Sequence, residues 1–172
     1  MKNLFFALIA MVAFTVFSGC NKDDDDTAVK NEFTYDGNTY DLVKGYLNDV
    51  GSNLNGTHDF DIYLTSSGLS NNNGTITGTG DLIYLDLNTN SSTGLEAGTY
   101  NWANTRTAFS IVPGSQAYVD YNFATNLGTT LTATAGTVDV AINGMETTIT
   151  FNLTVSGGKT LTGEWKGVLE DI

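Results

Sequence analysis

The sequence predicts an all-β protein with a single antiparallel domain, folded as a flattened barrel or as a two-sheet sandwich. Three observations favour this class. Apolar and polar residues alternate with a period of two in several segments, which is typical of half-buried strands. Beyond the N-terminus, apolar residues do not recur at helical spacing over any long window. Short turn-forming segments separate the alternating stretches, which favours an up-and-down arrangement of sequential strands. Barrel and sandwich alternate in the same way, so both remain open.

The clearest strands lie in the last third of the chain. Over 145–155 the odd positions are mostly apolar and the even positions are polar, which predicts one buried face and one wet face. A strand over 138–142 precedes it, and the dipeptide Asn143-Gly144 predicts a tight type I′ hairpin between the two. A further strand over 160–169 follows a turn at 156–159.

Earlier segments show the same alternation, for an expected total of about eight to ten strands. The boundaries of strands within 126–137, a stretch rich in Thr, Ala and Gly, are not predicted. Loops are expected at 66–74, 88–97 and 113–116, with a turn at 36–38. The expected strands cover 33–35, 39–47, 57–65, 75–87, 107–112 and 117–123.

The first nineteen residues have the pattern of a signal peptide. A basic start at Lys2 precedes an apolar run from Leu4 to Phe17, which is shorter than the roughly 20 residues of a membrane-spanning helix. The following Phe17-Ser18-Gly19-Cys20 resembles the lipobox of bacterial lipoproteins. That resemblance implies cleavage before Cys20 and acylation of its sulfur and its new amine. The expected partner of the anchor is therefore a lipid bilayer, bound through the Cys20 acyl chains.

Residues 20–30 are expected to form a lipidated acidic tether, followed by the β domain over 31–172. The tether's charged run resembles the export signal of surface lipoproteins of the phylum Bacteroidota, which implies display on the outer face of the outer membrane. The periplasmic face is the alternative. Asp26-Thr27-Ala28 resembles an O-glycosylation motif of that phylum, which implies Thr27 as the acceptor. The export-signal residues are Lys22, Asp23, Asp24, Asp25 and Asp26.

Segments of the domain resemble small Bacteroidota surface lipoproteins. They lie at 33–40, 95–100, 136–140 and 161–167. The resemblance implies a lipocalin-like or sandwich β domain and implies no activity for any residue.

Composition excludes several classes of function. The net charge is −12, and a nucleic-acid partner would need a basic patch. One Cys and one His exclude an internal disulfide framework and metal sites built from several of either residue. The sequence has neither a Gly-x-Ser-x-Gly elbow nor a phosphate-binding loop that opens a helix. We therefore predict no catalytic residue and no cofactor, and interpret His58, at the head of the strand over 57–65, as structural.

The acidic residues of the strands are expected to face water. Asp59, Asp61, Asp139 and Glu164 each alternate with apolar neighbours, which argues against a pair of catalytic carboxylates in a cleft. One segment has spaced oxygen ligands as in a calcium loop, although it lacks the Gly and Glu of an EF-hand. This weak metal candidate consists of Asp86, Asn88 and Asn90.

Aromatic residues near the expected loops are the candidates for stacking on a ligand: Tyr100, Trp102, Tyr118 and Tyr121. Trp165 shares its phase with Leu161 and is expected in the core. The expected function is that of a lipid-anchored cell-surface binding or accessory protein, with a glycan, a small apolar molecule or another protein as partner. A glycan hydrolase with two carboxylates and a structural or adhesion component are the alternatives. The oligomeric state is left open.

Overall fold

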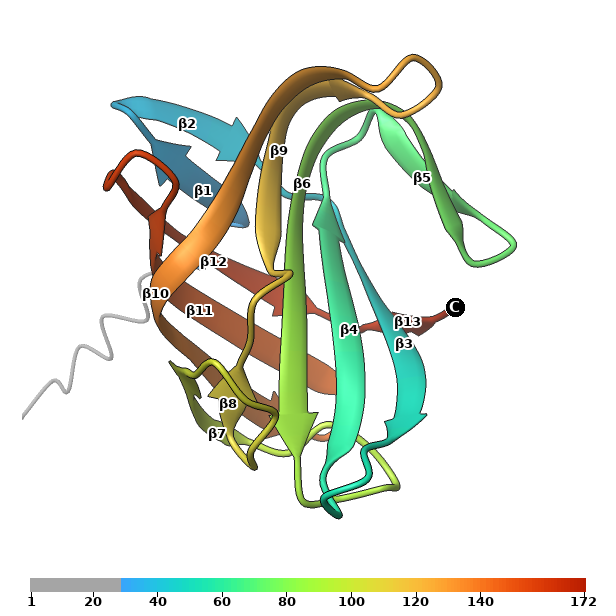
Figure 1. Ribbon diagram of the computed structural model, residues 1–172. Helices are drawn as coiled ribbons and strands as arrows, with labels where there is room; N and C mark the ends of the chain where they lie inside the picture. The colour runs from blue at the N-terminus through green and yellow to red at the C-terminus, as the bar shows by residue number, and fades with distance from the viewer. Residues whose placement is uncertain (1–28) are drawn as a thin grey trace, which may run out of the picture.

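The computed structural model describes residues 29–172, which form thirteen β strands and no helix (Figure 1). In that part of the chain, therefore, no helical segment is available to cross a membrane. The prediction of an all-β domain is confirmed. The strands are β1 (Glu32–Tyr35), β2 (Asn38–Asp41), β3 (Lys44–Ser52), β4 (His58–Thr65), β5 (Leu69–Asn72), β6 (Thr75–Thr89), β7 (Gly98–Trp102), β8 (Ser110–Ile111), β9 (Gln116–Asn122), β10 (Leu127–Asn143), β11 (Glu146–Val155), β12 (Thr160–Gly167) and β13 (Glu170–Asp171).

The strands form one hydrogen-bonded sheet that folds into two facing layers (Figure 1). One layer contains β13, β3, β4 and β6, and the other contains β10, β11, β12, β1 and β2. Strand β9 joins the layers because it pairs with both β6 and β10. Most pairings are antiparallel, but β13 pairs with β3 and β7 pairs with β8 in parallel. The N-terminal hairpin β1–β2 pairs with β12, so the strand order departs from a simple sequential meander.

Strand β10 passes from one layer into the other, and a bulge accompanies the change. Its register against β11 shifts between Ala133 and Ala135. The next residue, Gly136, has a φ of +126°, and a Cβ there would lie 2.2 Å from the carbonyl oxygen of Asn152. Only glycine tolerates both conditions. The stretch whose strand boundaries are not predicted from periodicity is therefore the first half of a long, bent strand.

Several expected boundaries are wrong. The expected loop at 66–74 contains β5, and the expected strand over 39–47 is interrupted between β2 and β3. The expected loop at 88–97 begins two residues later, because β6 continues to Thr89. At the β10–β11 hairpin the two turn residues are Gly144 and Met145, and only Gly144 has a positive φ, +63°. That pattern fits a type II′ turn rather than the expected type I′.

The main core lies between the two layers. Trp165 is buried there, as predicted, together with Phe33, Ile62 and Phe151. A second, smaller apolar cluster lies on the opposite side of the β3–β4–β6 layer, around Tyr46, Leu69, Ile76 and Leu82. Three of the four residues of this second cluster belong to β5 and β6, and the fourth, Tyr46, belongs to β3. This outer face therefore departs from the purely polar surface that alternation predicts, and it carries the candidate site.

Candidate functional site

The candidate site lies on the outer face of the layer, where β4, β6 and β9 run side by side (Figure 1). The register of β4 and β6 places Asp61 opposite Asp86 and Tyr63 opposite Tyr84. Because side chains two residues apart share one face of a strand, these four side chains lie together on the side away from the main core. Strand β9 continues the same surface, with Gln116 opposite Tyr84.

A groove of about 320 Å³ opens on this face. The Tyr63 and Tyr84 rings lie 5.1 Å apart at one side of it, and the Tyr118 and Phe123 rings lie 5.4 Å apart at another. The start of β6, at the tip of the β5–β6 hairpin, supplies a wall. We call this cavity the tyrosine groove, lined by Tyr63, Gly74, Thr75, Ile76, Leu82, Tyr84, Gln116, Tyr118 and Phe123.

The hairpin wall depends on its turn. Asn73 and Gly74, between β5 and β6, both have a positive φ, +51° and +82°, as a type I′ turn requires. An Asn-Gly dipeptide is the most favourable sequence for such a turn because both residues accept the left-handed conformation at low cost. The local sequence therefore determines a tight hairpin that can stand over the sheet.

Asp61 adjoins the polar ends of the groove tyrosines. Its carboxylate accepts hydrogen bonds from the Tyr84 hydroxyl at 2.8 Å and the Tyr63 hydroxyl at 3.3 Å. Burial raises the pKa of Asp61, and these hydrogen bonds oppose the rise. On the other side, the Tyr118 hydroxyl donates to Gln116 Oε1. The three tyrosine rings of the groove thus have polar partners at their hydroxyl ends.

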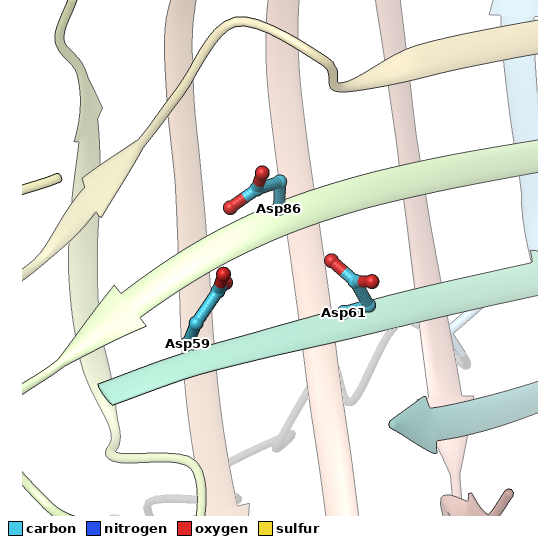
Figure 2. Close-up of side chains that lie close together, drawn as sticks. All are labelled: Asp59, Asp61 and Asp86. Carbon is cyan, nitrogen blue, oxygen red and sulfur yellow. The ribbon is translucent and has the colours of Figure 1, made fainter. Parts of the chain in front are cut away.

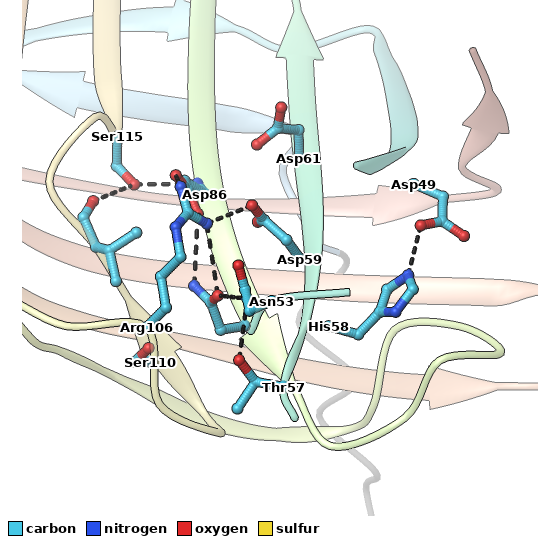
Figure 3. Close-up of polar contacts among 12 residues, drawn as sticks. Asp49, Asn53, Thr57, His58, Asp59, Asp61, Asp86, Arg106, Ser110 and Ser115 are labelled. Atoms are coloured by element: carbon cyan, nitrogen blue, oxygen red, sulfur yellow. Dashed lines mark hydrogen bonds and ion pairs between the residues drawn. The ribbon is translucent and has the colours of Figure 1, made fainter. Parts of the chain in front are cut away.

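Next to Asp61 lies a cluster of three carboxylates, Asp59, Asp61 and Asp86 (Figure 2). One oxygen from each lies within 4.8 Å of the others, a spacing that a hard cation such as Ca²⁺ could bridge. Arg106 serves as the counter-ion of two of them, Asp59 and Asp86 (Figure 3). Its Nη1 and Nη2 donate to the two oxygens of Asp86 at 2.8 and 2.7 Å, and Nη1 also donates to Asp59. The arrangement is therefore an ion-pair network built around a guanidinium.

Asp59 is the most perturbed member of the cluster. Its pKa is raised to about 7 by burial and by the neighbouring Asp86 carboxylate, which outweigh the opposing effect of Arg106. Asp59 is 5% exposed and Asp86 is 4% exposed. Both carboxylates are therefore covered rather than exposed at the surface.

The network attaches the segment after β7 to the sheet. The backbone N–H of Phe109 donates to the Asn88 carbonyl at 2.7 Å, and the side-chain amide of Asn55 donates to the Arg106 carbonyl. Asn53 connects the β3–β4 loop to the same network through Asn88, at 2.8 Å (Figure 3). Two loops therefore meet over the lower ends of β4 and β6 and close this end of the face.

These observations correct the expectation that the strand acids face water. Asp59 and Asp61 do lie on the side away from the core, but Asp59 is buried and Asp61 half-buried. The cause is the covering segment with Arg106, which no alternation pattern reveals. Asp139 is exposed and Glu164 half-buried, in closer agreement with the expectation.

The weak calcium candidate does not form a loop. Asp86 and Asn88 belong to β6, and Asn90 follows the end of that strand. Their alternate spacing therefore reflects one face of a strand, and the Asp86 carboxylate is bound by Arg106.

The four stacking candidates divide into two pairs. Tyr100 is fully buried in the main core, where its hydroxyl donates to the Glu96 carbonyl, so its assignment as a ligand-stacking residue is wrong. Trp102 packs half-buried against the same core. Tyr118 lines the groove. The Tyr121 ring packs against the Tyr118 ring, with 4.8 Å between the two ring centroids.

Three aromatic residues of the groove are not among those predicted from the sequence: Tyr63, Tyr84 and Phe123. A signal for two of them was present. Tyr63 shares its phase with Asp59 and Asp61, and Tyr84 shares its phase with Asp86, so both are aromatic residues on an otherwise polar strand face. An aromatic residue on an otherwise polar strand face indicates that this face is covered or binds a ligand.

His58 begins β4 and is 7% exposed. Its Nε2 lies 2.5 Å from Asp49 Oδ1 (Figure 3), and its Nδ1 lies 3.2 Å from Ser52 Oγ. Both ring nitrogens therefore have partners on β3, which is consistent with the predicted structural role.

The remaining predicted residues lie outside the described range of 29–172. They are the signal peptide 1–19, the lipidation residue Cys20, the export-signal residues 22–26 and the glycosylation candidate Thr27. Comparison with known proteins found no matching family model, curated protein or solved structure.

Proposed function

We propose that this protein is a lipid-anchored cell-surface binding or accessory protein whose β domain holds a ligand in the tyrosine groove. One observation carries the proposal: a concave surface on the outer face of a sheet lined by half-buried aromatic rings. Its volume is at the lower end of the range of ligand pockets, roughly 300–1,000 Å³. Aromatic side chains provide large contact areas at low entropic cost, so they suit a binding surface.

The proposed role is non-catalytic. Hydrolysis of a glycosidic bond needs an acid and a second carboxylate that both reach the substrate. Asp59 and Asp86 are close together, but both are buried and share the Arg106 guanidinium. We therefore expect no release of reducing sugar ends when the protein is incubated with polysaccharides. Release that is lost in Asp59→Asn would instead favour the hydrolase alternative.

The proposed anchor rests on the sequence. Cys20 follows a signal peptide and a lipobox-like segment, and four consecutive aspartates follow at 23–26. Three acyl chains would hold the protein on a bilayer, whereas a single chain binds only marginally. Cys20→Ala should abolish labelling by radioactive palmitate. Replacement of residues 23–26 by Ala should protect the protein from protease added to intact cells, and unchanged cleavage would contradict surface display.

Ligand binding in the groove can be tested with a neutral aromatic probe, N-phenyl-1-naphthylamine, on purified protein that begins at residue 21 and lacks acyl chains. We expect probe fluorescence to rise on binding, and Phe123→Ala to weaken binding by about tenfold, as loss of a well-packed aromatic contact predicts. Tyr35→Ala is the matched control, because Tyr35 is a half-buried aromatic residue on the distant β1 strand. Equal probe binding by both variants would contradict the groove as the binding site.

A further inference from the structure

We infer that the ligand of the tyrosine groove is an uncharged saccharide, with sugar rings stacked on Tyr118 and Phe123 and hydroxyl groups bound by Asp61 and Gln116. The inference rests on the proposed function and specifies its ligand class. Three features of the groove carry it: a rigid aromatic platform, free hydrogen-bonding capacity beside that platform, and a negative charge that no lining cation compensates.

The platform consists of three aromatic rings from β9 and the residue that follows it. Tyr118 and Tyr121 lie 4.8 Å apart at an interplanar angle of 68°, and Tyr121 and Phe123 lie 4.8 Å apart at 65°. Such edge-to-face contacts favour defined ring orientations. The partly negative face of an aromatic ring attracts the C–H groups of a sugar ring. Tyr118 and Phe123 line the groove, so their ordered rings suit stacking.

Two polar residues lie at the groove: Gln116 lines it, and Asp61 adjoins it at the hydroxyl groups of the lining Tyr63 and Tyr84. The Asp61 carboxylate accepts bonds from two tyrosine hydroxyls, although an ionised carboxylate has about four acceptor sites. Gln116 Oε1 already accepts from Tyr118, and within residues 29–172 no acceptor is found for the Gln116 amide hydrogens. A hydroxyl group both donates and accepts. A sugar could therefore donate to Asp61 and accept from Gln116.

An apolar ligand fits these polar groups less well. Covering Asp61 and Gln116 with an apolar molecule would remove water from them without replacing the lost hydrogen bonds, which costs free energy. A saccharide replaces the water with hydroxyls and still buries its C–H faces against the rings. The combination of aromatic rings and incompletely satisfied polar groups therefore favours a polyhydroxylated ligand over a purely apolar one.

The charge around the groove favours an uncharged ligand. Asp61, which has no basic partner among the described residues, lies beside the Tyr63–Tyr84 side, and Asp81 accepts a hydrogen bond from the backbone of Asp120 next to Tyr121. Neither Lys nor Arg is among the groove-lining residues, and Arg106 is engaged by Asp86 and Asp59. Phosphate, sulfate and uronate groups would be repelled by this field.

The test is affinity electrophoresis of the mature, lipidated protein in detergent. Native gels would contain either neutral polysaccharides (a soluble β-glucan, a xylan, a mannan or amylopectin) or acidic ones (pectate, alginate or heparin). We expect retardation by at least one neutral polysaccharide and by none of the acidic ones. Tyr118→Ala and Asp61→Asn should each raise the apparent Kd by about tenfold, because each removes one favourable contact. Tyr35→Ala should leave the Kd unchanged.

The outcomes separate this inference from the proposed function. Retardation by the acidic polysaccharides alone would overturn the inference, as would neutral binding that Tyr118→Ala and Asp61→Asn leave unchanged. Failure of all the polysaccharides to bind, with the aromatic probe still bound in a Phe123-dependent way, would overturn the saccharide inference and leave the binding groove in place. Loss of probe binding as well would overturn both. Circular dichroism of each variant distinguishes loss of binding from loss of folding.

Discussion

Strands β4 and β11 have the same alternation in sequence but different outer faces in the fold. Both bury one side against the main core, through Ile62 of β4 and Phe151 of β11. The outer positions of β11 carry Thr150 and Asn152, which are exposed. The corresponding positions of β4 carry Asp59, which is buried, and Tyr63, which is half-buried. Identical periodicity thus leads to a solvent-facing surface in one layer and to a covered site in the other.

The difference comes from segments that lie far away along the chain. Arg106 covers the acids of β4 from 47 residues beyond Asp59, and the β5–β6 hairpin contributes a wall of the groove. The outer positions of β11 project from the other layer, and its strand neighbours are β10 and β12. Alternation therefore establishes that a strand has two faces, but the nature of the second face depends on which loops pack over it. Three predictions test this comparison, from the largest expected effect to the smallest.

Removal of the covering guanidinium should have the largest effect. Arg106→Met leaves the buried Asp59 and Asp86 without their counter-ion, and breaking a buried ion pair by removal of one partner costs about 3 kcal/mol or more. Urea unfolding followed by circular dichroism measures this change. Lys159→Met removes an exposed ion pair with Asp36 and should have no measurable effect, because exposed pairs contribute little. Equal losses in the two variants would show that the Arg106 network is an ordinary surface feature.

The raised pKa of Asp59 predicts a specific pH dependence. In the folded protein this pKa is about 7, whereas in the unfolded chain it should be about 3.9. The unfolded state therefore releases this proton first, and the free energy of unfolding falls as the pH rises from about 4 to about 7. Asp59→Asn should remove this part of the slope, which is at most about 4 kcal/mol for a difference of about 3 pKa units.

The measurement for Asp59 is the difference in unfolding free energy between the variant and the wild type at several pH values. That difference should shift in favour of Asp59→Asn between pH 4 and 7 and stay constant above pH 8. Thr150→Asn, on the open face of β11, removes no ionisable group and should give a difference that is the same at every pH. A pH-independent difference for Asp59→Asn would refute the shifted pKa.

A smaller effect on stability is expected when a threonine on the outer face of β4 or of β11 is replaced by valine. Thr65 on β4 is fully buried, and within the described residues its hydroxyl has no hydrogen-bond partner. Thr65→Val should therefore stabilise the protein by about 1 kcal/mol, because it removes an unsatisfied buried polar group. Thr150→Val on β11 should change stability by no more than about 0.5 kcal/mol. Thermal or urea unfolding measures both, and destabilisation by Thr65→Val would indicate that the hydroxyl has a partner.

Local patterns predicted much of the strand structure. The buried positions from Thr147 to Val155 and the core position of Trp165 follow directly from alternation, and the structure confirms them. The strand boundaries within 126–137 could not be predicted from alternation, because the bulge next to Gly136 depends on the close approach of this residue to the Asn152 carbonyl. That contact joins two strands, so no window around Gly136 contains it.

The candidate site was less predictable than the strands. Tyr118 was selected for its position near a loop, but Tyr100, selected for the same reason, is a core residue. Arg106 was not selected, because its partners Asp86 and Asp59 lie 20 and 47 residues away and a single Arg in a loop has no local signature. Tyr63 was detectable in principle as an aromatic residue in phase with acids.

Sequence alone determined the class of the domain and the two faces of its strands, because both depend on the period of the side chains along a strand. Only the tertiary structure decided that the outer face of β4, β6 and β9 is a groove with a covered acidic network. Its parts, the β5–β6 hairpin, the β9 aromatics and Arg106, come from distant segments. They meet there because the sheet folds over itself, and sequence spacing does not record that proximity.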